Sequence, residues 1–399
     1  MAAHVIIGGG LAGAKAAEAL RDKGHDGELV LIGEEPHRPY ERPPLSKGYL
    51  TGQSARDEVF VHPSDWYREH KVDLRLGSAA TAIDRSSRSV ALADGSHVPY
   101  DKLLLATGSS PRRLPVPGAD GALYLRRLED SEAIKAAATS GQRVVVIGGG
   151  WIGLEVAAAA RQAGAQVAVV EMLELPLLRV LGPEVAAVYA DLHRANGVDL
   201  RLGASVREVA AGRVELADGT SLAADTVVVG VGITPNTALA EAAGLSVDNG
   251  VLVDATLRTS DPDIFAAGDV ANALHPLLGK HIRVEHWANA LNQPAVAAAG
   301  MLGADASYDE LPYFYTDQFN LGMEYIGYVE PDGYDNVVVR GDTGALEFIA
   351  FWLRDGRILA GMNVNVWDVV DPIKALIRSG ATVDPARLAD PAIPLDDLT

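Results

Sequence analysis

HVIIGGGLAG at residues 4–13 joins an apolar run to a glycine-rich turn, and the same pattern returns as VVVIGGGWIG at residues 144–153. In both copies the apolar run suits a buried strand, and small residues suited to a helix follow the motif G-x-G-x-x-G. Each glycine of the second copy lies 140 positions after its counterpart in the first. The sequence therefore predicts two dinucleotide-binding units in one chain.

The spacing around each turn supports this interpretation. Helices are predicted over residues 14–20 and 154–163, and second strands over residues 29–32 and 166–170. An acid follows each second strand, and these acids, Glu34 and Glu171, lie 26 and 23 residues after the first glycine of their motifs. A ribose-binding carboxylate is expected roughly 20 residues after it. The alternative is a pair of tight turns in an ordinary α/β protein, which the two complete copies disfavour.

Length and charge narrow the class of protein. A chain of 399 residues suggests two or three domains. The net charge of −19 disfavours a nucleic-acid binder, which needs a basic surface. Every apolar run is shorter than the roughly 18 residues of a membrane span, so no membrane association is expected. Because the first strand begins at His4, a signal peptide has no room and we expect a cytoplasmic protein.

The sequence contains no cysteine. This excludes disulfides, thiolate metal sites and cysteine-ligated iron–sulfur clusters. The histidines show no metal-ligand spacing, so no metal site is expected. Two dinucleotide sites suggest electron transfer between a bound flavin and a nicotinamide. Without a redox-active cysteine pair, electrons must pass directly from the flavin to an external acceptor.

The rest of the chain indicates further units. Pro111, Pro115 and Pro117 indicate a boundary before the second glycine motif. After Tyr315, glycine and aspartate turns alternate with short aromatic and β-branched runs, which predict a small antiparallel sheet. A helix is predicted over residues 369–378, and the proline-containing segment after it is expected to be loosely ordered.

Together these motifs resemble the FAD-dependent, NADH-using ferredoxin reductases of bacterial oxygenase systems, and the likeness covers nearly the whole chain. The resemblance implies a glutathione-reductase-like α/β fold with two Rossmann-like dinucleotide-binding domains, for FAD and NAD, and a small α+β C-terminal domain. Besides the two glycine turns, the motifs that carry it are RPPLSK at 42–47, ATG at 106–108, YLRRLED at 124–130, LE at 154–155, AGD at 267–269 and VEHWANA at 284–290.

The expected domain boundaries follow from this likeness. Residues 1–112 with 240–315 form the FAD-binding domain, residues 113–239 the NAD-binding domain and residues 316–399 the C-terminal domain. The resemblance also implies that Arg42 and Lys47 face the flavin in the FAD site. The residues assigned to FAD are Gly8, Gly10, Leu11, Ala12, Gly13, Glu34, Arg42, Lys47, Ala80, Ala106, Thr107, Gly108, Arg126, Gly268, Asp269, Glu285, His286 and Trp287. Those assigned to NADH are Gly150, Trp151, Ile152, Gly153, Glu155, Glu171, Arg179, Val231 and Gly232.

Two of these residues are candidate catalytic groups. Lys47 and Glu155 are interpreted as an ion pair beside the nicotinamide, where the lysine would stabilise anionic reduced flavin. The alternatives are a surface lysine and a solvated helical carboxylate.

Glu171 indicates the preferred nicotinamide cofactor. A carboxylate at the end of the second strand accepts hydrogen bonds from the ribose hydroxyls and repels a 2′-phosphate, which favours NADH over NADPH. No basic residue follows until Arg179.

One segment departs from the family pattern. Where the family often has W-x-W-S-D-Q, this chain has YFYTDQ at residues 313–318, which leaves open how the segment meets the nicotinamide or the ferredoxin. Lys374 and Arg378, one helical turn apart, are either a ferredoxin-docking patch or a solvated helix face.

The sequence thus predicts an NADH:ferredoxin oxidoreductase. Electrons would pass from NADH through FAD to a [2Fe–2S] ferredoxin that serves a cytochrome P450 or a Rieske oxygenase. The alternatives are a reductase of rubredoxin or of another acceptor, and an interaction flavoprotein resembling apoptosis-inducing factor.

Overall fold

A computed structural model describes residues 3–398, and the chain divides into two compact units. The first contains the described residues up to Arg42, with Ala55–Ser110 and Ile233–Glu310. The second contains Pro43–Ser54, Pro111–Gly232 and the chain from Leu311 onward. Residues 43–54, which the sequence placed in the FAD domain, therefore group with the second unit. The three-domain division stays a prediction.

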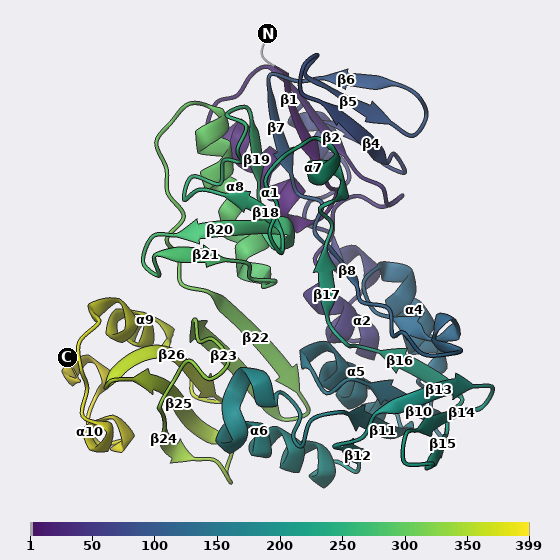
Figure 1. The fold of residues 1–399 in the computed structure, drawn as a ribbon, viewed down its shortest axis with the longest axis vertical. Helices are drawn as coiled ribbons and strands as arrows, with labels where there is room; N and C mark the ends of the chain where they lie inside the picture. Colours follow the sequence, from purple (N-terminus) through teal and green to yellow (C-terminus); the bar gives the residue numbers. More distant parts are fainter. Residues whose placement is uncertain (1–2, 399) are drawn as a thin grey trace. The chain divides into compact units, whose positions relative to one another are not determined.

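The first unit is built on a parallel five-stranded sheet. Figure 1 labels its strands β19, β7, β1 and β2. β1 lies at its centre, so every residue from Val5 to Ile7 is buried and pairs with a neighbouring strand on each side. Helix α1 (Leu11–Asp22) follows β1 and packs against α8 (Trp287–Met301). The strand order is β19 (Ile264–Ala266), β7 (Lys102–Leu105), β1 (Ala3–Ile7), β2 (Glu28–Ile32) and β3 (Asp73–Arg75).

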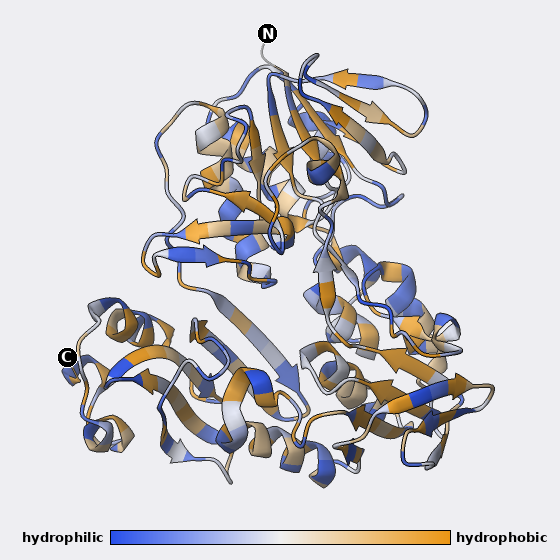
Figure 2. Ribbon diagram, in the orientation of Figure 1, coloured by the Kyte–Doolittle hydropathy of each residue, from blue (hydrophilic) through white to orange (hydrophobic). Residues whose placement is uncertain are grey.

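The second unit repeats this arrangement. Its parallel sheet also has the glycine-turn strand at the centre, and helix α5 (Trp151–Gln162) follows it. These central strands are mostly coloured as hydrophobic in Figure 2, as expected for strands covered on both faces. The strand order is β12 (Asp199–Leu202), β11 (Gln166–Glu171), β10 (Arg143–Ile147), β16 (Thr226–Val229) and β9 (Leu123–Tyr124).

Smaller elements extend both units. A three-stranded antiparallel sheet accompanies each parallel sheet, and each of these two small sheets keeps sequence order. They are β4 (Ala80–Asp84), β5 (Ser89–Leu92) and β6 (His97–Pro99) in the first unit, and β13 (Val206–Ala210), β14 (Arg213–Leu216) and β15 (Ser221–Ala223) in the second. The other short strands are β8 (Ser109–Pro111), β17 (Ile233–Pro235), β18 (Val251–Val253), β20 (Ala271–His275) and β21 (Lys280–Ile282).

The C-terminal part of the second unit is an antiparallel sheet, as the sequence predicted. Its strands run in the order β22 (Tyr313–Gln318), β23 (Leu321–Gly327), β26 (Arg357–Val364), β25 (Glu347–Arg354) and β24 (Asn336–Asp342). Helix α9 (Val370–Ser379) packs on this sheet through the buried Ile373.

The expectation of a loosely ordered tail is wrong for its described part. Helix α10 (Pro385–Ala389) lies there, and Leu388, Leu395 and Leu398 are buried in the core beneath α9. Arg340 donates to the carbonyls of Asp390 at 2.8 Å and of Ile393 at 2.5 Å. Leucines spaced through a proline-rich segment therefore anchor it to the sheet.

The remaining helices complete the two units. They are α2 (Gly48–Thr51), α3 (Trp66–Glu69), α4 (Leu128–Ala137), α6 (Leu178–Ala195), which is interrupted at Gly182, and α7 (Ala238–Ala242). Among residues 3–398, no helix is both long enough and apolar enough to cross a membrane.

Candidate active site and nucleotide-binding turns

The first and third glycines of each motif are required by the backbone around them. Gly8 has φ 127°, and a Cβ there would lie 2.0 Å from the carbonyl oxygen of Ala106. A Cβ at Gly13 would lie 2.0 Å from the carbonyl oxygen of Gly8. The second unit repeats this geometry. Gly148 also has a positive φ, 107°, and a Cβ at Gly153 would lie 2.0 Å from the Gly148 oxygen. Larger residues are therefore excluded at the same two places of each turn.

The second glycine of each motif has a different surrounding. Gly10 and Gly150 cap helices α1 and α5 in an extended conformation, and a Cβ on either would meet nothing within 4 Å. No side chain caps these helices, and neither first turn carries an acid. The space beside each capping glycine is thus open, and a helix N-terminus without a capping side chain or an acid suits the oxygens of a pyrophosphate. Leu11, Ala12, Trp151 and Ile152 begin these helices.

The acids after the second strands differ in their surroundings. Glu34 follows β2 and is exposed. Its neighbour Glu35 is the residue that accepts hydrogen bonds from the Tyr40 hydroxyl and, at 3.1 Å, from Arg42. These contacts within the first unit hold Arg42 in a fixed position. The sequence did not single out Glu35, although it directly follows the predicted ribose ligand.

Glu171 is fixed by the turn that it accompanies. The Gly149 N–H donates to its Oε2 at 2.6 Å, and the Leu173 N–H donates to its Oε1 at 2.9 Å. The carboxylate therefore lies against the second glycine motif, as a ribose ligand should. The adjacent Met172 has an exposed fraction of 67%.

The predicted pair of Lys47 and Glu155 is formed within the second unit. Lys47 Nζ lies 2.7 Å from Glu155 Oε1, and the side chains are 16% and 3% exposed. The Ser46 hydroxyl donates to Glu155 Oε2 and the Thr316 hydroxyl to Oε1, both at 2.5 Å. Lys47 also lies 5.2 Å from the centre of the Tyr315 ring. Their place beside a nicotinamide stays a prediction.

Strand β22 contacts the pair of Lys47 and Glu155, while its contacts with the nicotinamide or the ferredoxin stay open. Its even-numbered residues are buried, and this alternation turns Thr316 toward Glu155 on helix α5. The altered YFYTDQ segment therefore meets the ion pair through its threonine and its second tyrosine. Partial desolvation raises the pKa of Asp317, the nearby charge of Lys47 opposes the rise, and Glu155 adds to it.

Residues assigned to FAD cluster at the carboxyl ends of β7 and β19 in the first unit. Thr107 Oγ1 donates to the Asn236 carbonyl at 2.8 Å, and the Asn236 side chain donates back to the Thr107 carbonyl. Ala106 precedes this pair, and Gly108 accepts from the Asn236 N–H at 2.9 Å. The sequence missed Asn236, because its partner lies 129 residues away.

Asp269 is held in the same region. Ser109 donates to Asp269 Oδ2 at 2.7 Å, and the Gly268 N–H donates to Gln293 on helix α8 at 2.8 Å. Gly268 has φ 79°, and a Cβ there would lie 3.1 Å from the Ala12 side chain. Ser109 and Gln293 are further residues that the sequence did not single out.

The segment before helix α8 is also anchored. Glu285 pairs with Arg283 at 2.5 Å, and Trp287 Nε1 donates to Glu41 at 3.0 Å. Burial lowers the pKa of His286 to about 4, and the charge of Asp269 opposes this shift. His286 is therefore neutral at neutral pH.

The remaining predicted residues are more peripheral in their units. Ala80 begins β4 in the first unit and is half-buried. In the second unit the Arg126 N–H donates to Asp130 at 2.9 Å, and Arg179 is exposed on the first turn of α6. Val231 and Gly232 follow β16, and Val231 is half-buried whereas Gly232 is exposed.

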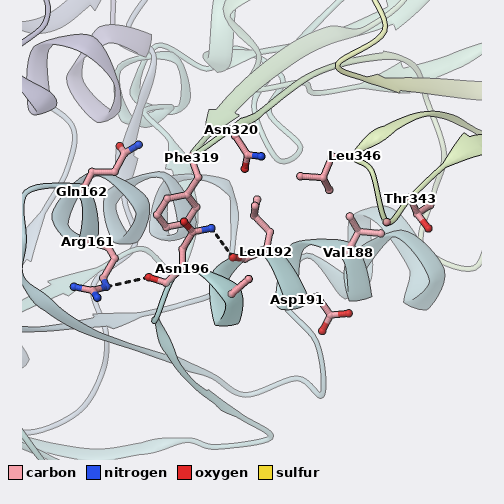
Figure 3. Close-up of a pocket in the computed structure, with 12 residues that line it drawn as sticks. Arg161, Gln162, Val188, Asp191, Leu192, Asn196, Phe319, Asn320, Thr343 and Leu346 are labelled. Atoms are coloured by element: carbon pink, nitrogen blue, oxygen red, sulfur yellow. Dashed lines mark hydrogen bonds between the residues drawn. The ribbon is translucent and has the colours of Figure 1, made fainter.

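A cavity of about 960 Å³ lies elsewhere in the second unit, between helices α5 and α6 and the turns of the C-terminal sheet (Figure 3). Its Arg161 donates to the Asn196 carbonyl at 3.0 Å, and Asn196 donates to the Leu192 carbonyl at 2.8 Å. None of the predicted site residues lines this cavity.

Comparison with known proteins identifies the family. Residues 2–294 match the family described as pyridine nucleotide-disulphide oxidoreductase, and residues 313–399 match a reductase C-terminal domain. The chain belongs to the pyridine nucleotide-disulphide oxidoreductase family. Because the chain lacks cysteine, it cannot relay electrons through a cysteine pair of its own.

Individual relatives of this oxidoreductase match along nearly the whole chain. The ferredoxin–NAD⁺ reductase component of the anthranilate 1,2-dioxygenase system of Burkholderia cepacia is 44% identical over 98% of both chains. Putidaredoxin reductase of Pseudomonas putida is 40% identical over 99% of this chain and 96% of its own. The structure of a covalent putidaredoxin reductase–putidaredoxin complex matches with a TM-score of 0.94 at 39% identity, over 99% of this chain and 97% of that one. The predicted α/β fold and family are thus confirmed.

Proposed function

We propose that this protein is an FAD-dependent NADH:ferredoxin oxidoreductase that reduces a [2Fe–2S] ferredoxin serving a cytochrome P450 or a Rieske oxygenase. Its family uses FAD and NAD(P)H, and its relatives include reductase components of both kinds of oxygenase system. The observation that carries the proposal is the duplicated glycine turn in a chain without cysteine. Two nucleotides then bind to one chain, and electrons leave directly for a separate protein.

The residues of the two turns suit the two nucleotides. The helix N-termini at Gly10 and Gly150 bind the pyrophosphates, and Glu171 binds the NADH ribose. Asp269 and the segment from Glu285 to Trp287 bind and cover the flavin end of FAD. When bound, FAD supplies the chemistry that accepts a hydride and gives single electrons, which no side chain of this sequence can supply.

Lys47 and Glu155 provide the electrostatic part of the mechanism. The Lys47 ammonium favours the build-up of negative charge on a reduced ring, and Glu155 holds that ammonium in place. Because Glu155 is 3% exposed and the Lys47 side chain 16%, water screens this pair little. We place the protein in the cytoplasm, where reduced nicotinamides are available, and cell fractionation tests this.

Anaerobic mixing of purified protein with NADH tests the reductase function. We expect the oxidised-flavin absorbance to fall, and we expect cytochrome c reduction only when a [2Fe–2S] ferredoxin is added. Equal stimulation by rubredoxin would favour the broader acceptor class. A chain that is purified without flavin, or whose flavin NADH does not reduce, would contradict the proposal.

The manner of FAD binding is tested on the same material. With no cysteine to form a thioether, heat or acid should release the flavin into the supernatant. Flavin that stays with the precipitated chain would overturn non-covalent binding.

A further inference from the structure

A buried line of polar side chains leads from helix α6 across strand β22 to Glu155 on helix α5. His193 Nε2 lies 2.8 Å from Gln318 Oε1, and Gln318 Nε2 lies 3.2 Å from Thr316 Oγ1. Thr316 Oγ1 in turn lies 2.5 Å from Glu155 Oε1. All four residues belong to the second unit, and each is at most 3% exposed. Their hydrogen bonds are therefore made with protein groups.

The direction of each hydrogen bond follows from the chemistry of the groups. Glu155 also accepts from Lys47 and Ser46, so it acts as a carboxylate acceptor and Thr316 must donate to it. With its one proton used, Thr316 must accept from the amide nitrogen of Gln318.

This order fixes the state of the histidine. The Gln318 carbonyl oxygen faces His193, so Nε2 of His193 must carry a proton. Nδ1 is buried without a hydrogen-bond partner and suits the unprotonated position. Burial lowers the pKa of His193, and its hydrogen bond with Gln318 opposes the shift only in part. His193 is thus a neutral Nε2–H tautomer.

Every bond of this line points toward the carboxylate. Donors that are aligned head to tail polarise one another, and the effect is largest where the surroundings exclude water. Lys47 and Thr316 occupy Oε1, while Ser46 occupies Oε2, so rotation of the carboxylate would break bonds on both oxygens. The far end is covered by Phe319, whose ring meets that of His193 at 5.2 Å and lines the cavity of Figure 3.

We propose that Thr316, Gln318 and His193 are positioning residues that fix Glu155, and through it the Lys47 ammonium, for hydride transfer from NADH. This inference rests on the proposed function. It assigns a role to the one segment that departs from the family pattern. Strand β22 then contributes to the chemistry through its hydroxyl and amide side chains, although none of the three residues touches a reacting atom.

Replacement of the threonine tests the proposal. Thr316→Val keeps the shape of the side chain but removes the donor to Glu155 and the acceptor for Gln318, whereas Thr316→Ser keeps both. We expect the limiting rate constant for flavin reduction by NADH to fall about ten-fold in T316V, the size of one lost hydrogen bond to a charged group. T316S should stay within about two-fold of wild type, and the NADH dissociation constant should change little in both.

Matched measurements separate positioning from folding. Thr343→Val makes the same chemical change at an exposed turn and should leave the rate constant unchanged. Flavin content and melting temperature report a purely structural effect. If T316V lowers these but reduces its bound flavin at the wild-type rate, the positioning role is overturned. If NADH fails to reduce wild-type flavin, the proposed function itself fails.

A second readout does not depend on turnover. Nitrogen-15 NMR of histidine-labelled protein, with the His193 signals assigned from a His193→Gln variant, should show a protonated Nε2 and an unprotonated Nδ1 at neutral pH. Gln318→Leu should abolish the preference. An Nδ1–H tautomer or a charged ring in the wild type would reverse the order of the hydrogen bonds and overturn the network.

Discussion

Glu171→Gln should weaken the preference for NADH over NADPH. The wild-type carboxylate is held against the glycine turn by the N–H groups of Gly149 and Leu173, at 2.6 and 2.9 Å. Alanine would leave both of these N–H groups without an acceptor, so a change in cofactor preference could not be separated from a folding defect. Glutamine removes the charge and keeps one carbonyl oxygen for one of them. A second change, Met172→Arg, adds a cation at a side chain that is 67% exposed and so costs the fold little.

The magnitude follows from charge. A 2′-phosphate carries about −1.5 to −2 charges, and two unit charges 4 Å apart repel by about 1 kcal/mol in water and about 4 kcal/mol near a protein surface. Glu171 is half-buried, which places the effect between these limits. We expect a loss of about 1.5–3 kcal/mol of discrimination, which is roughly a 10- to 150-fold fall in the ratio of kcat/KM for NADH to that for NADPH. The added arginine should lower the ratio further.

Steady-state reduction of ferricyanide with each cofactor measures this ratio. Glu174→Gln is the matched control, since it removes the same charge from an exposed side chain nearby and should leave the ratio within about two-fold. The reasoning is refuted if wild type uses NADPH as well as NADH, or if both glutamine variants change the ratio equally.

Three further changes probe the turn, the surface and the core. Gly13→Ala should prevent proper folding of the first unit, because its Cβ would lie 2.0 Å from a carbonyl oxygen. Gly10→Ala should fold but bind FAD more weakly. Circular dichroism and flavin titration distinguish the two outcomes. Reversing Lys374 and the exposed Arg378 to Glu should raise the KM for ferredoxin at low salt and leave ferricyanide reduction unchanged, and equal loss in both assays would indicate a folding defect. Burial, with the charge of a neighbouring histidine, lowers the pKa of His4 to about 4, so the unfolded chain binds a proton below its ordinary value of 6.5 while the folded chain does not. Stability from this residue is therefore lost as the pH falls from 6.5 toward 4, and the loss of unfolding free energy at about pH 5 should be roughly 2 kcal/mol. His4→Phe should remove this loss, so its melting temperature should fall less between pH 7.5 and about 5 than that of wild type. An equal fall in both proteins would count against this reasoning.

The sequence alone was sufficient for the two parallel sheets and their glycine turns. Buried parallel strands read as continuous apolar runs, and the turn needs glycine at fixed places, so both signals are local. The predicted helix over residues 369–378 is observed as Val370–Ser379 for the same reason, since apolar residues recur at helical spacing. The pairing of Lys47 with Glu155 was also predicted, but through the family pattern and not from spacing.

Only the tertiary structure decided which distant groups complete each site. Thr316 meets Glu155 across 161 residues of sequence, and Ser46 meets it across 109, because β22 and the segment 43–54 both pack against helix α5. The same holds for Asn236 and for the ordered tail, whose leucines and Arg340 contacts look ordinary in the sequence. Hydrogen bonds between buried side chains depend on positions in space to within tenths of an ångström, whereas hydrophobic periodicity records only which face of an element is covered.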